Sequence, residues 1–428
     1  MEDRAGAANR TSDVVGSNSF LDRESLRHPI YWLLCGAMFA LPLGTSPITI
    51  LAICILLAWI FTGEFIRRRR TFLAQPWFWP LVAWVILIWA GLLYTPDIHE
   101  MGFQYATKTY YWLYALAVVS VSFSKRPLST PIKAFLVGLF INSLVGYLQW
   151  GNVFPENAKF GRYGNTGLYG GNNTLSVLLN LGIMISSFFY KTSEWKRDRI
   201  IYGFLMLFYF IHLLILGGRG GYLVFAVLSP IVLYNILPMR SVLIIVLSYL
   251  LLIGMVFSSS VVRERFAETV TEFREHFSAA ADEKSGEKYS EHLDRIYMWH
   301  WAIQLFKEHP IIGVGTGGYQ QATITKGGDR SVAHPHNNLL YVAATHGLVG
   351  LVVFLWFFGV LFKTGWRHRQ DAAGFFVLCS SLVIFVGGFT DTHILNTGTG
   401  ILLAVTTGLS SSVGGCPGDM KDGRKEIS

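Results

Sequence analysis

Long apolar runs recur along almost the whole chain, and they constrain the fold more than any other feature. Only 14% of the 428 residues are charged, whereas soluble domains carry charge on roughly a quarter of their positions. The runs are long enough to cross about 30 Å of hydrocarbon. The chain is therefore predicted to be an all-α integral membrane protein with about twelve transmembrane helices, near 29–44, 47–64, 77–94, 109–122, 132–150, 172–190, 200–217, 220–237, 241–258, 338–362, 372–390 and 395–412.

The distribution of basic residues predicts the orientation of these spans. If the N-terminus is cytosolic, 22 of the 35 Lys and Arg residues fall on the inner side. The short outer segments hold four, and the remaining nine lie in one long outer loop, which the positive-inside rule exempts. Both termini are therefore predicted to be cytosolic. The chain has a net charge of +8. Because the basic residues are concentrated on the predicted inner side, this charge is attributed to membrane topology, and nucleic-acid binding is not indicated.

The runs and charges together predict five regions. These are a cytosolic N-terminal tail (1–28), spans one to nine (29–258), a periplasmic loop (259–337), spans ten to twelve (338–412) and a cytosolic C-terminal tail (413–428). No cleavable signal peptide is expected, because the first apolar run follows about 28 polar residues. None of the four cysteines lies in the periplasmic loop, so no disulfide framework is predicted there.

The periplasmic loop is expected to contain two amphipathic helices and a polar arm that returns to the membrane. The first helix is predicted over Val261–Phe277 and the second over Glu291–Glu308, which ends before Pro310. The second helix should bury an apolar stripe formed by Ile296, Trp299, Ile303 and Phe306. The glycine-rich segment 313–318 is either a flexible turn or a cradle for an anion, and both interpretations stay open.

Two arginines are candidates for binding an anion on the outer side. Arg219 stands between two pairs of glycines at the edge of an apolar run, where an arginine is costly unless it snorkels or meets an anion. Arg295 lies one helical turn before Trp299, and its alternative role is a salt bridge to Glu291 or Asp294. Two guanidinium groups that converge on one point suit a diphosphate.

His336, at the start of the tenth span, is the candidate general base. A histidine can take a proton from an alcohol near neutral pH. His334 and His346 are competing candidates. Pro335 holds the neighbouring residue in an extended geometry, so the side chains of His334 and His336 are expected to diverge, with only one facing the site.

Further polar residues of the outer face complete the set. Arg162, with Asn172 at the start of the sixth span, supplies another cation beside an intramembrane amide, and Asp391 lies in the short loop before the twelfth span. Asn337 follows the candidate base directly. Headgroup contacts and helix caps are the alternative roles. No Asp-x-Asp pattern occurs on this face, so no bound metal is predicted.

Three motifs follow one another in a fixed order. They are Gly218-Arg219-Gly220-Gly221-Tyr222, then Arg295 with Trp299, His309-Pro310 and Gly313-Val314-Gly315, and finally His336-Asn337 with Gly347-Leu348-Val349-Gly350. Together they resemble the O-antigen ligase and polymerase superfamily, most closely the O-antigen ligases. The motifs cover about 215–350, and the twelve-span layout extends the resemblance over the chain.

The resemblance implies a GT-C-like fold and a glycosyltransferase of the bacterial inner membrane with a periplasmic active site. Its donor would be O-antigen carried on undecaprenyl diphosphate, and its acceptor a hydroxyl of lipid A-core oligosaccharide. By resemblance, Arg219, Arg295 and, more loosely, Arg162 hold the diphosphate, and His336 acts on the acceptor. Asn337, His334, Asp391 and Asn172 are secondary candidates. Neither a cofactor nor a metal is expected.

The chemistry is consistent with these residues. A glycosyl diphosphate is already activated, so the enzyme has only to stabilise the departing charge and deprotonate a hydroxyl. Direct attack would invert the anomeric centre. An O-antigen polymerase and a protein O-oligosaccharyltransferase remain close alternatives. A flippase or transporter is more remote, because the spans are almost free of the mid-membrane ionisable residues that transporters usually carry.

Overall fold

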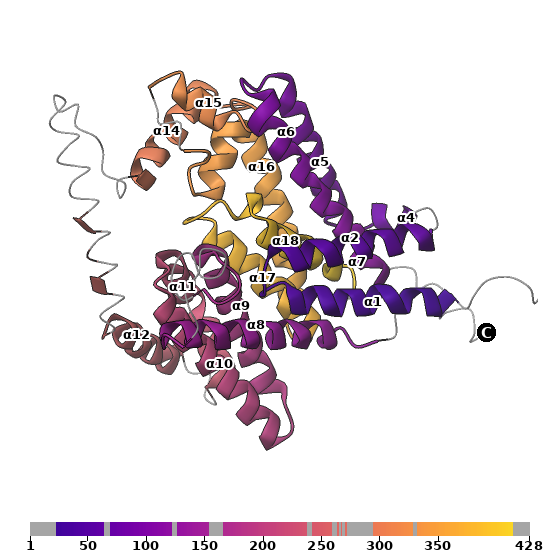
Figure 1. Ribbon diagram of the computed structural model, residues 1–428, viewed down its shortest axis with the longest axis vertical. Coiled ribbons are helices and arrows are strands. Elements are labelled where there is room, and N and C mark those ends of the chain that lie inside the picture. Colours follow the sequence, from indigo (N-terminus) through magenta and orange to yellow (C-terminus); the bar gives the residue numbers. More distant parts are fainter. Residues whose placement is uncertain are drawn as a thin grey trace, which may run out of the picture.

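The architecture within the described residues is entirely helical (Figure 1). The computed structural model describes residues 23–63, 69–121, 126–153, 166–237, 242–258, 263–264, 267, 270–271, 294–327 and 332–413. No β-strand occurs in these ranges. The sequence-based prediction of an all-α chain is therefore confirmed for this part of the molecule.

Six of the described helices are long and apolar enough to cross a membrane. They are α2 (Thr45–Thr62), α8 (Ser129–Trp150), α9 (Asn172–Thr192), α10 (Lys196–Leu216), α11 (Arg219–Ile236) and α16 (Asn338–Arg367). Four apolar segments are shorter: Pro29–Ala40 in α1 (Arg23–Ala40), Phe78–Leu93, which comprises α5 (Phe78–Ala90) and η1 (Gly91–Leu93), α17 (Ala372–Gly387) and α18 (Thr397–Ser410). The chain is thus a multi-pass membrane protein.

Each of the twelve expected runs contains a described helix, since α7 (Tyr111–Val121) and α12 (Val242–Ser258) fill the two remaining places. A count of twelve membrane crossings stays a prediction. The other described elements are short or lie outside these runs: α4 (Arg69–Leu73), η2 (Ile98–Gly102), α6 (Phe103–Thr107), η3 (Lys108–Tyr110), α14 (Asp294–Glu308), α15 (Tyr319–Ile324) and η4 (His393–Leu395).

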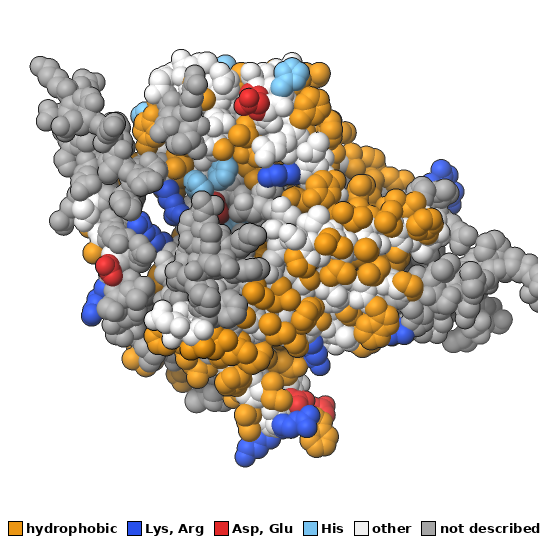
Figure 2. Space-filling model, viewed as in Figure 1, with side chains coloured by type: hydrophobic (Ala, Val, Ile, Leu, Met, Phe, Trp, Pro, Cys, Tyr) orange, Lys and Arg blue, Asp and Glu red, His pale blue; other side chains and the backbone are white. Residues whose placement is uncertain are grey.

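Apolar side chains cover much of the surface. Phe61 is 85% exposed and Leu251 is 71% exposed. Figure 2 shows broad apolar areas over the lower and right-hand parts of one face, with charged side chains mostly at the edges of the molecule. In water such areas would cause aggregation. They indicate that this surface faces lipid.

Helix α9 occupies the centre of the bundle, with every residue from Thr174 to Phe189 buried. It packs against α10, α11 and α17, while α1 lies between α2 and α8 (Figure 1). Helix α16 packs against α5, α14 and α17. The N-terminal ends of α9, α11, α16 and α18 meet around the loop 388–396, and we call this end of the bundle the site end.

A break inside α16 is sealed by the glycine-rich segment. Gly347 has φ 61° and ψ −155°, which interrupts the helical hydrogen bonds. The amides of Val314 and Gly315 donate to the carbonyls of Ala344 and Thr345, and the amides of Leu348 and Val349 donate to the carbonyls of Pro310 and Ile311. Irregular backbone at membrane depth requires such internal partners.

The break in α16 also explains why glycines occur at positions 313 and 347. A Cβ at Gly347 would meet the Ile311 carbonyl, and a Cβ at Gly313 would meet the backbone at Thr345. The segment 313–318 is therefore neither a flexible turn nor a general anion cradle, because the amides of Val314 and Gly315 are committed to α16.

The second helix of the predicted periplasmic loop is present as α14, but its most deeply buried residues differ from the predicted stripe. Met298, Ala302 and Leu305 are its buried residues, and Ile303 is 43% exposed. The predicted stripe is therefore only partly right: Ile296, Trp299 and Phe306 are half-buried. The most deeply buried residues lie one position before Trp299, Ile303 and Phe306, and two of them, Ala302 and Leu305, pack in a cluster with residues of α15 and α16. The first predicted helix, 261–277, lies almost entirely outside the described residues.

Candidate active site

The segment that carries the candidate base is held at both ends. Before it, the indole Nε1 of Trp299 donates to the carbonyl of Pro335 at 2.9 Å. After it, Asn337 is the N-cap of α16, and its Oδ1 accepts from the amide of Leu340 at 3.1 Å. His336 between them has φ 46°, a region that residues other than glycine seldom occupy. Strain of this kind recurs at functional sites.

The opposite wall of the site is the loop 388–396, which joins α17 to α18. The amide of Asn338 donates to the carbonyl of Gly388 at 2.6 Å. The side-chain amide of Asn337 donates to the carbonyl of Phe389, and its backbone amide donates to Thr392 Oγ1. Asn337 therefore fastens the start of α16 to this loop, which accounts for an asparagine directly after the candidate base.

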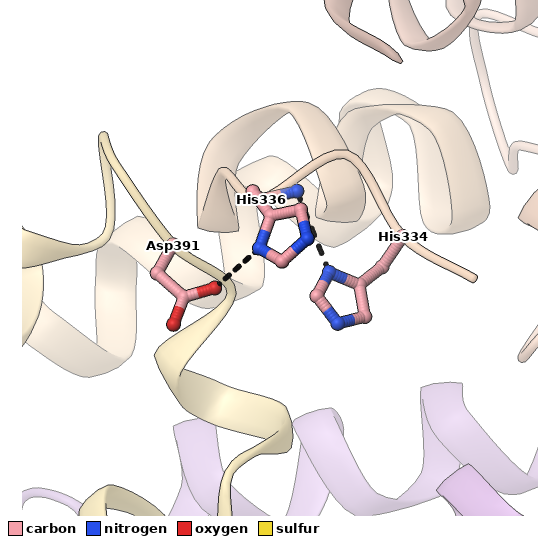
Figure 3. Close-up of side chains that lie close together, drawn as sticks. All are labelled: His334, His336 and Asp391. Carbon is pink, nitrogen blue, oxygen red and sulfur yellow. Dashed lines mark hydrogen bonds and ion pairs between the residues drawn. The ribbon is translucent and has the colours of Figure 1, made fainter. Parts of the chain in front are cut away.

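These contacts bring His336 and Asp391 together. His336 Nδ1 lies 2.8 Å from Asp391 Oδ1, and the two side chains are 36% and 7% exposed (Figure 3). Asp391 also accepts from the amide of Thr392 and from Asn396 Nδ2. Burial on its own raises the pKa of Asp391, but the hydrogen bond from His336 and the charges of nearby histidines outweigh burial and lower the pKa well below its usual range.

The ionised carboxylate defines the state of the histidine. An ionised Asp391 can only accept hydrogen bonds, so His336 Nδ1 must be the donor. In the neutral ring, Nε2 is then unprotonated and available to accept a proton. The more exposed histidine thus presents a basic nitrogen, while the buried carboxylate orients the ring and stabilises positive charge on it.

His334 lies beside His336 rather than pointing away from it. The two ring centroids are 4.4 Å apart, and His334 Nδ1 accepts from the backbone amide of His336 at 3.4 Å (Figure 3). The expectation that the side chains diverge is wrong, because the positive φ of His336 turns the chain back. Burial, together with the charges of His336 and Lys108, outweighs the opposing charge of Asp391 and lowers the pKa of His334 to about 4.

The same three side chains have the composition of a metal site. One ligand atom from each of His334, His336 and Asp391 lies within 4.8 Å of the others. In the present arrangement, however, His336 Nδ1 forms a hydrogen bond with Asp391, and His334 Nδ1 accepts a hydrogen bond from the backbone amide of His336. The hydrogen-bonded pair accounts for this geometry without an ion.

Arg219 begins α11 at the flank of the loop. The turn before it uses Gly217 at φ 71°, and a Cβ at Gly220 would meet the side chain of Thr390, next to Asp391. A Cβ at Gly221 would meet Ser176. Two of the four glycines are therefore required by packing. The N-cap residue of α11, Gly218, makes no side-chain cap, and a helix N-terminus without such a cap attracts anions.

Arg295 is linked to the candidate base through α14. It lies half-buried near the start of this helix, one turn before Trp299, whose indole holds Pro335. Asn172 begins α9, and its backbone carbonyl would lie 3.9 Å from a Cβ at Gly218. Asn172 Oδ1 is buried without a partner among the described residues. Both therefore lie on elements that meet at the site end.

The remaining candidates fare differently. Arg162 lies outside the described residues. His346 is 2% exposed and packs edge-on against Trp84, with ring centroids 5.9 Å apart, so it is not part of the His336 and Asp391 pair.

Sequence reasoning missed Lys108 as a site residue. Its Nζ donates to the carbonyl of Leu395, at the far end of the loop, at 2.6 Å. The only sequence signal was its isolation on the outer side.

The fold and the site define a class: a multi-pass helical membrane protein with a histidine and a buried carboxylate paired at one end of its bundle. Residues 204–355 match the family model of the O-antigen ligase. This segment thus matches an O-antigen ligase family domain, and the predicted resemblance to the O-antigen ligase and polymerase superfamily is confirmed over these residues. No curated protein matches the chain significantly. The matched segment contains Arg219, Arg295 and His336, whereas Asp391 and Lys108 lie outside it.

Proposed function

We propose that the protein is an O-antigen ligase of the bacterial inner membrane. It transfers glycan from undecaprenyl diphosphate to a hydroxyl of lipid A-core oligosaccharide at the periplasmic face, with both termini cytosolic. The family match supports the superfamily. The single observation that carries the proposal further is the 2.8 Å pair of His336 and Asp391, beside an uncapped helix N-terminus that bears an arginine.

The proposed reaction is a direct displacement. The acceptor hydroxyl attacks the anomeric carbon while His336 Nε2 takes its proton, and the glycosidic bond to the diphosphate breaks. Asp391 positions the ring and stabilises the imidazolium that forms. The bond electrons leave with the diphosphate, which Arg219, Arg295 and the first amides of α11 stabilise. A single displacement inverts the anomeric centre.

Metal independence is part of the proposal. The arginines stabilise the leaving group directly, so a Lewis acid is not required. His334, His336 and Asp391 nevertheless have the composition of a metal site. We expect EDTA treatment, followed by dialysis, to leave transfer by the purified protein unchanged. Loss of activity that zinc or magnesium restores would contradict the assignment of His336 as a base.

Reconstitution tests the function directly. Purified protein in nanodiscs is mixed with glycan on undecaprenyl diphosphate and with lipid A-core oligosaccharide, and the product is resolved by electrophoresis and mass spectrometry. A ligase produces glycan-capped lipid A-core. Lengthening of the lipid-linked glycan would identify a polymerase, and transfer to protein an oligosaccharyltransferase. Absence of any transfer, together with movement of the donor across vesicles, would favour a transporter.

A deletion strain gives an independent readout. Without a ligase, long glycan should remain on the lipid carrier, because polymerisation continues while transfer to the core stops. Without a polymerase, single repeat units should instead be attached to the core. Complementation with the His336→Ala variant, compared with wild type, shows whether the phenotype depends on the proposed site.

A further inference from the structure

Lys108 is a half-buried cation beside the site that the proposed reaction does not use. It lies in η3, between α6 and α7, and its ammonium donates to the carbonyl of Leu395 and lies 5.0 Å from the ring centre of Tyr105. No carboxylate within the described ranges lies within 4 Å of it. Burial lowers the pKa of Lys108 because it disfavours the charged ammonium. A nearby anionic ligand would stabilise the charged form.

A cavity of about 40 Å³ adjoins Lys108, room for about three water molecules or a group of similar size. Its lining combines aromatic rings with polar atoms, including Tyr105, Thr316 and His346. His346 Nδ1 is buried and has no hydrogen-bond partner among the described residues. A lysine without a described counter-ion and an unpartnered buried nitrogen therefore line one space.

The position of Lys108 relative to the loop indicates which substrate it meets. Thr390, just before Asp391, packs against the start of α11, where Arg219 lies. Leu395, after Asp391, is held by Lys108. Figure 2 shows basic side chains on either side of the histidines near the middle of this face. An inverting displacement requires the nucleophile and the leaving group on opposite sides of the reacting carbon.

We propose that Lys108 and the adjoining cavity bind an anionic group, phosphate or carboxylate, of the acceptor substrate. This inference rests on the proposed function and extends it: the arginines receive the diphosphate on the α11 flank, and Lys108 receives the charged acceptor on the η3 flank. His336 lies between them. An acceptor with an anion near its attacking hydroxyl is thereby distinguished from a neutral glycan.

The test compares acceptors with and without phosphate. Wild type, Lys108→Gln and Lys108→Arg are assayed in nanodiscs of neutral phosphatidylcholine, with lipid A-core oligosaccharide before and after removal of its phosphates by hydrofluoric acid. Glutamine retains a donor for the Leu395 carbonyl. Lys108→Gln should raise the KM for the phosphorylated acceptor about tenfold, leave kcat and the donor KM nearly unchanged, and leave the KM for the dephosphorylated acceptor unchanged. Arginine should restore most of the loss.

A matched control is Lys326→Gln. Lys326 lies in the same predicted periplasmic loop as His336 and forms an ion pair with Glu308 at 2.6 Å, away from the cavity lining. It should leave both KM values unchanged. An equal loss with both acceptors would overturn the inference, as would a change confined to the donor KM. An effect that appears only in nanodiscs of anionic lipid would assign Lys108 to bulk headgroups and also overturn it.

A binding measurement separates failure of this inference from failure of the proposed function. Trp84 and Trp112 line the cavity, so occupancy should change tryptophan fluorescence without turnover. Titration of phosphorylated lipid A-core into wild type should give a saturable change that Lys108→Gln weakens about tenfold. A wild type that binds but never transfers would refute the function alone. An identical titration in both proteins would refute the role of Lys108.

Discussion

Arg219 and Arg295 reach the site end from different elements, one at an uncapped helix terminus and one on α14. Lysine retains the charge but loses the planar, bidentate donor pair. We expect Arg219→Lys and Arg295→Lys each to reduce transfer by about tenfold to a hundredfold, the equivalent of about 1.5–3 kcal/mol for a charged hydrogen bond.

The measurement for the arginines is kcat/KM for the lipid-linked donor, with membrane insertion checked by detergent extraction. Arg369→Lys is a suitable control, because Arg369 follows α16 at its other end and bonds to the carbonyl of Trp366. Full activity in both site variants would show that paired recognition of the diphosphate by arginine is wrong.

In the proposed mechanism, His336 acts as the base and Asp391 as the carboxylate that positions it. Removing the base should reduce kcat by about 10²–10⁴-fold in His336→Ala, with donor binding retained. Asp391→Asn keeps the shape but can no longer accept from Nδ1 with a full negative charge, and we expect a loss of about 10²-fold.

The pH profile of kcat distinguishes these two roles. Replacing a carboxylate that positions the base should change the pH dependence of kcat, whereas replacing a residue with only a structural role should lower activity equally at every pH. His334→Ala should lose less than His336→Ala, because His334 Nδ1 is occupied by a backbone amide. Full activity in His336→Ala would remove the base from the mechanism.

Site residues that stand in a local sequence pattern could be predicted, whereas contacts between positions far apart in the sequence could not. His336, Arg219 and Arg295 were identified because each stands in a recognisable local pattern. The contact between His336 and Asp391 spans 55 positions, and no local pattern encodes such a pairing. Lys108 lies 287 positions from its partner Leu395, so it could be interpreted only as a charge that sets topology.

The burial of His334 has a consequence for stability. With a native pKa of about 4, it stays neutral where an unfolded histidine, with a pKa near 6.5, takes up a proton. The unfolded state binds more protons between these values, so stability is lost as pH falls from about 6.5 to 4, by at most about 1.4 kcal/mol per pH unit. Burial also lowers the pKa of His393, which adds to this trend.

We therefore expect the thermal unfolding midpoint to decrease between pH 7 and pH 4.5, and to decrease less steeply in His334→Gln. The measurement is unfolding followed by fluorescence in one detergent at constant ionic strength. Equal slopes in wild type and the variant would mean that His334 is not buried in its neutral form.

At the scale of elements, the broken helix α16 depends on one residue. A side chain at Gly347 would need a positive φ and would contact the Ile311 carbonyl. We expect Gly347→Ala to destabilise the protein by about 2–4 kcal/mol. It should also reduce activity, because α16 carries the capped end next to His336.

A matched control lies in the same helix. Gly359 has open space around its Cβ position, so Gly359→Ala should stabilise the helix by about 0.5–1 kcal/mol. Thermal unfolding and transfer activity of the two variants are measured side by side. Equal midpoints for Gly347→Ala and wild type would show that the segment 310–315 does not require the break.

The elements themselves were largely predictable, because apolar runs of membrane length can form only a few structures. The breaks and buried faces within these helices were less predictable. The run 338–362 is predominantly apolar, with Thr345-His346-Gly347 inside it, and this pattern does not by itself show that Gly347 leaves the helical region. The break depends on the partner segment, whose amides and carbonyls replace those of the helix. The buried face of α14 likewise depends on what packs against it.

At the scale of the whole molecule, the site is assembled from segments that the family match only partly covers. Residues 204–355 contain Arg219, Arg295 and His336, while the loop 388–396 contains Asp391 and η3 contains Lys108. A truncated protein that retains only the matched segment would lack Asp391, which is proposed to orient the base. Activity is therefore expected to require the helices on both sides of that segment.

Topology decides whether this assembly can meet its substrates. The segments assigned to the inner side carry 22 basic residues against four in the short segments assigned to the outer side, which predicts cytosolic termini and a periplasmic loop over 259–337. We expect a cysteine at Ser285 to react with a membrane-impermeant maleimide in intact spheroplasts, and a cysteine at Ser428 to react only after lysis. The background for both is a chain in which Cys35, Cys54, Cys379 and Cys416 are replaced by serine or alanine and which still complements the deletion strain. Labelling of both positions from the same side would contradict this orientation, and it would place the loop that carries His336 on the same side as the C-terminus.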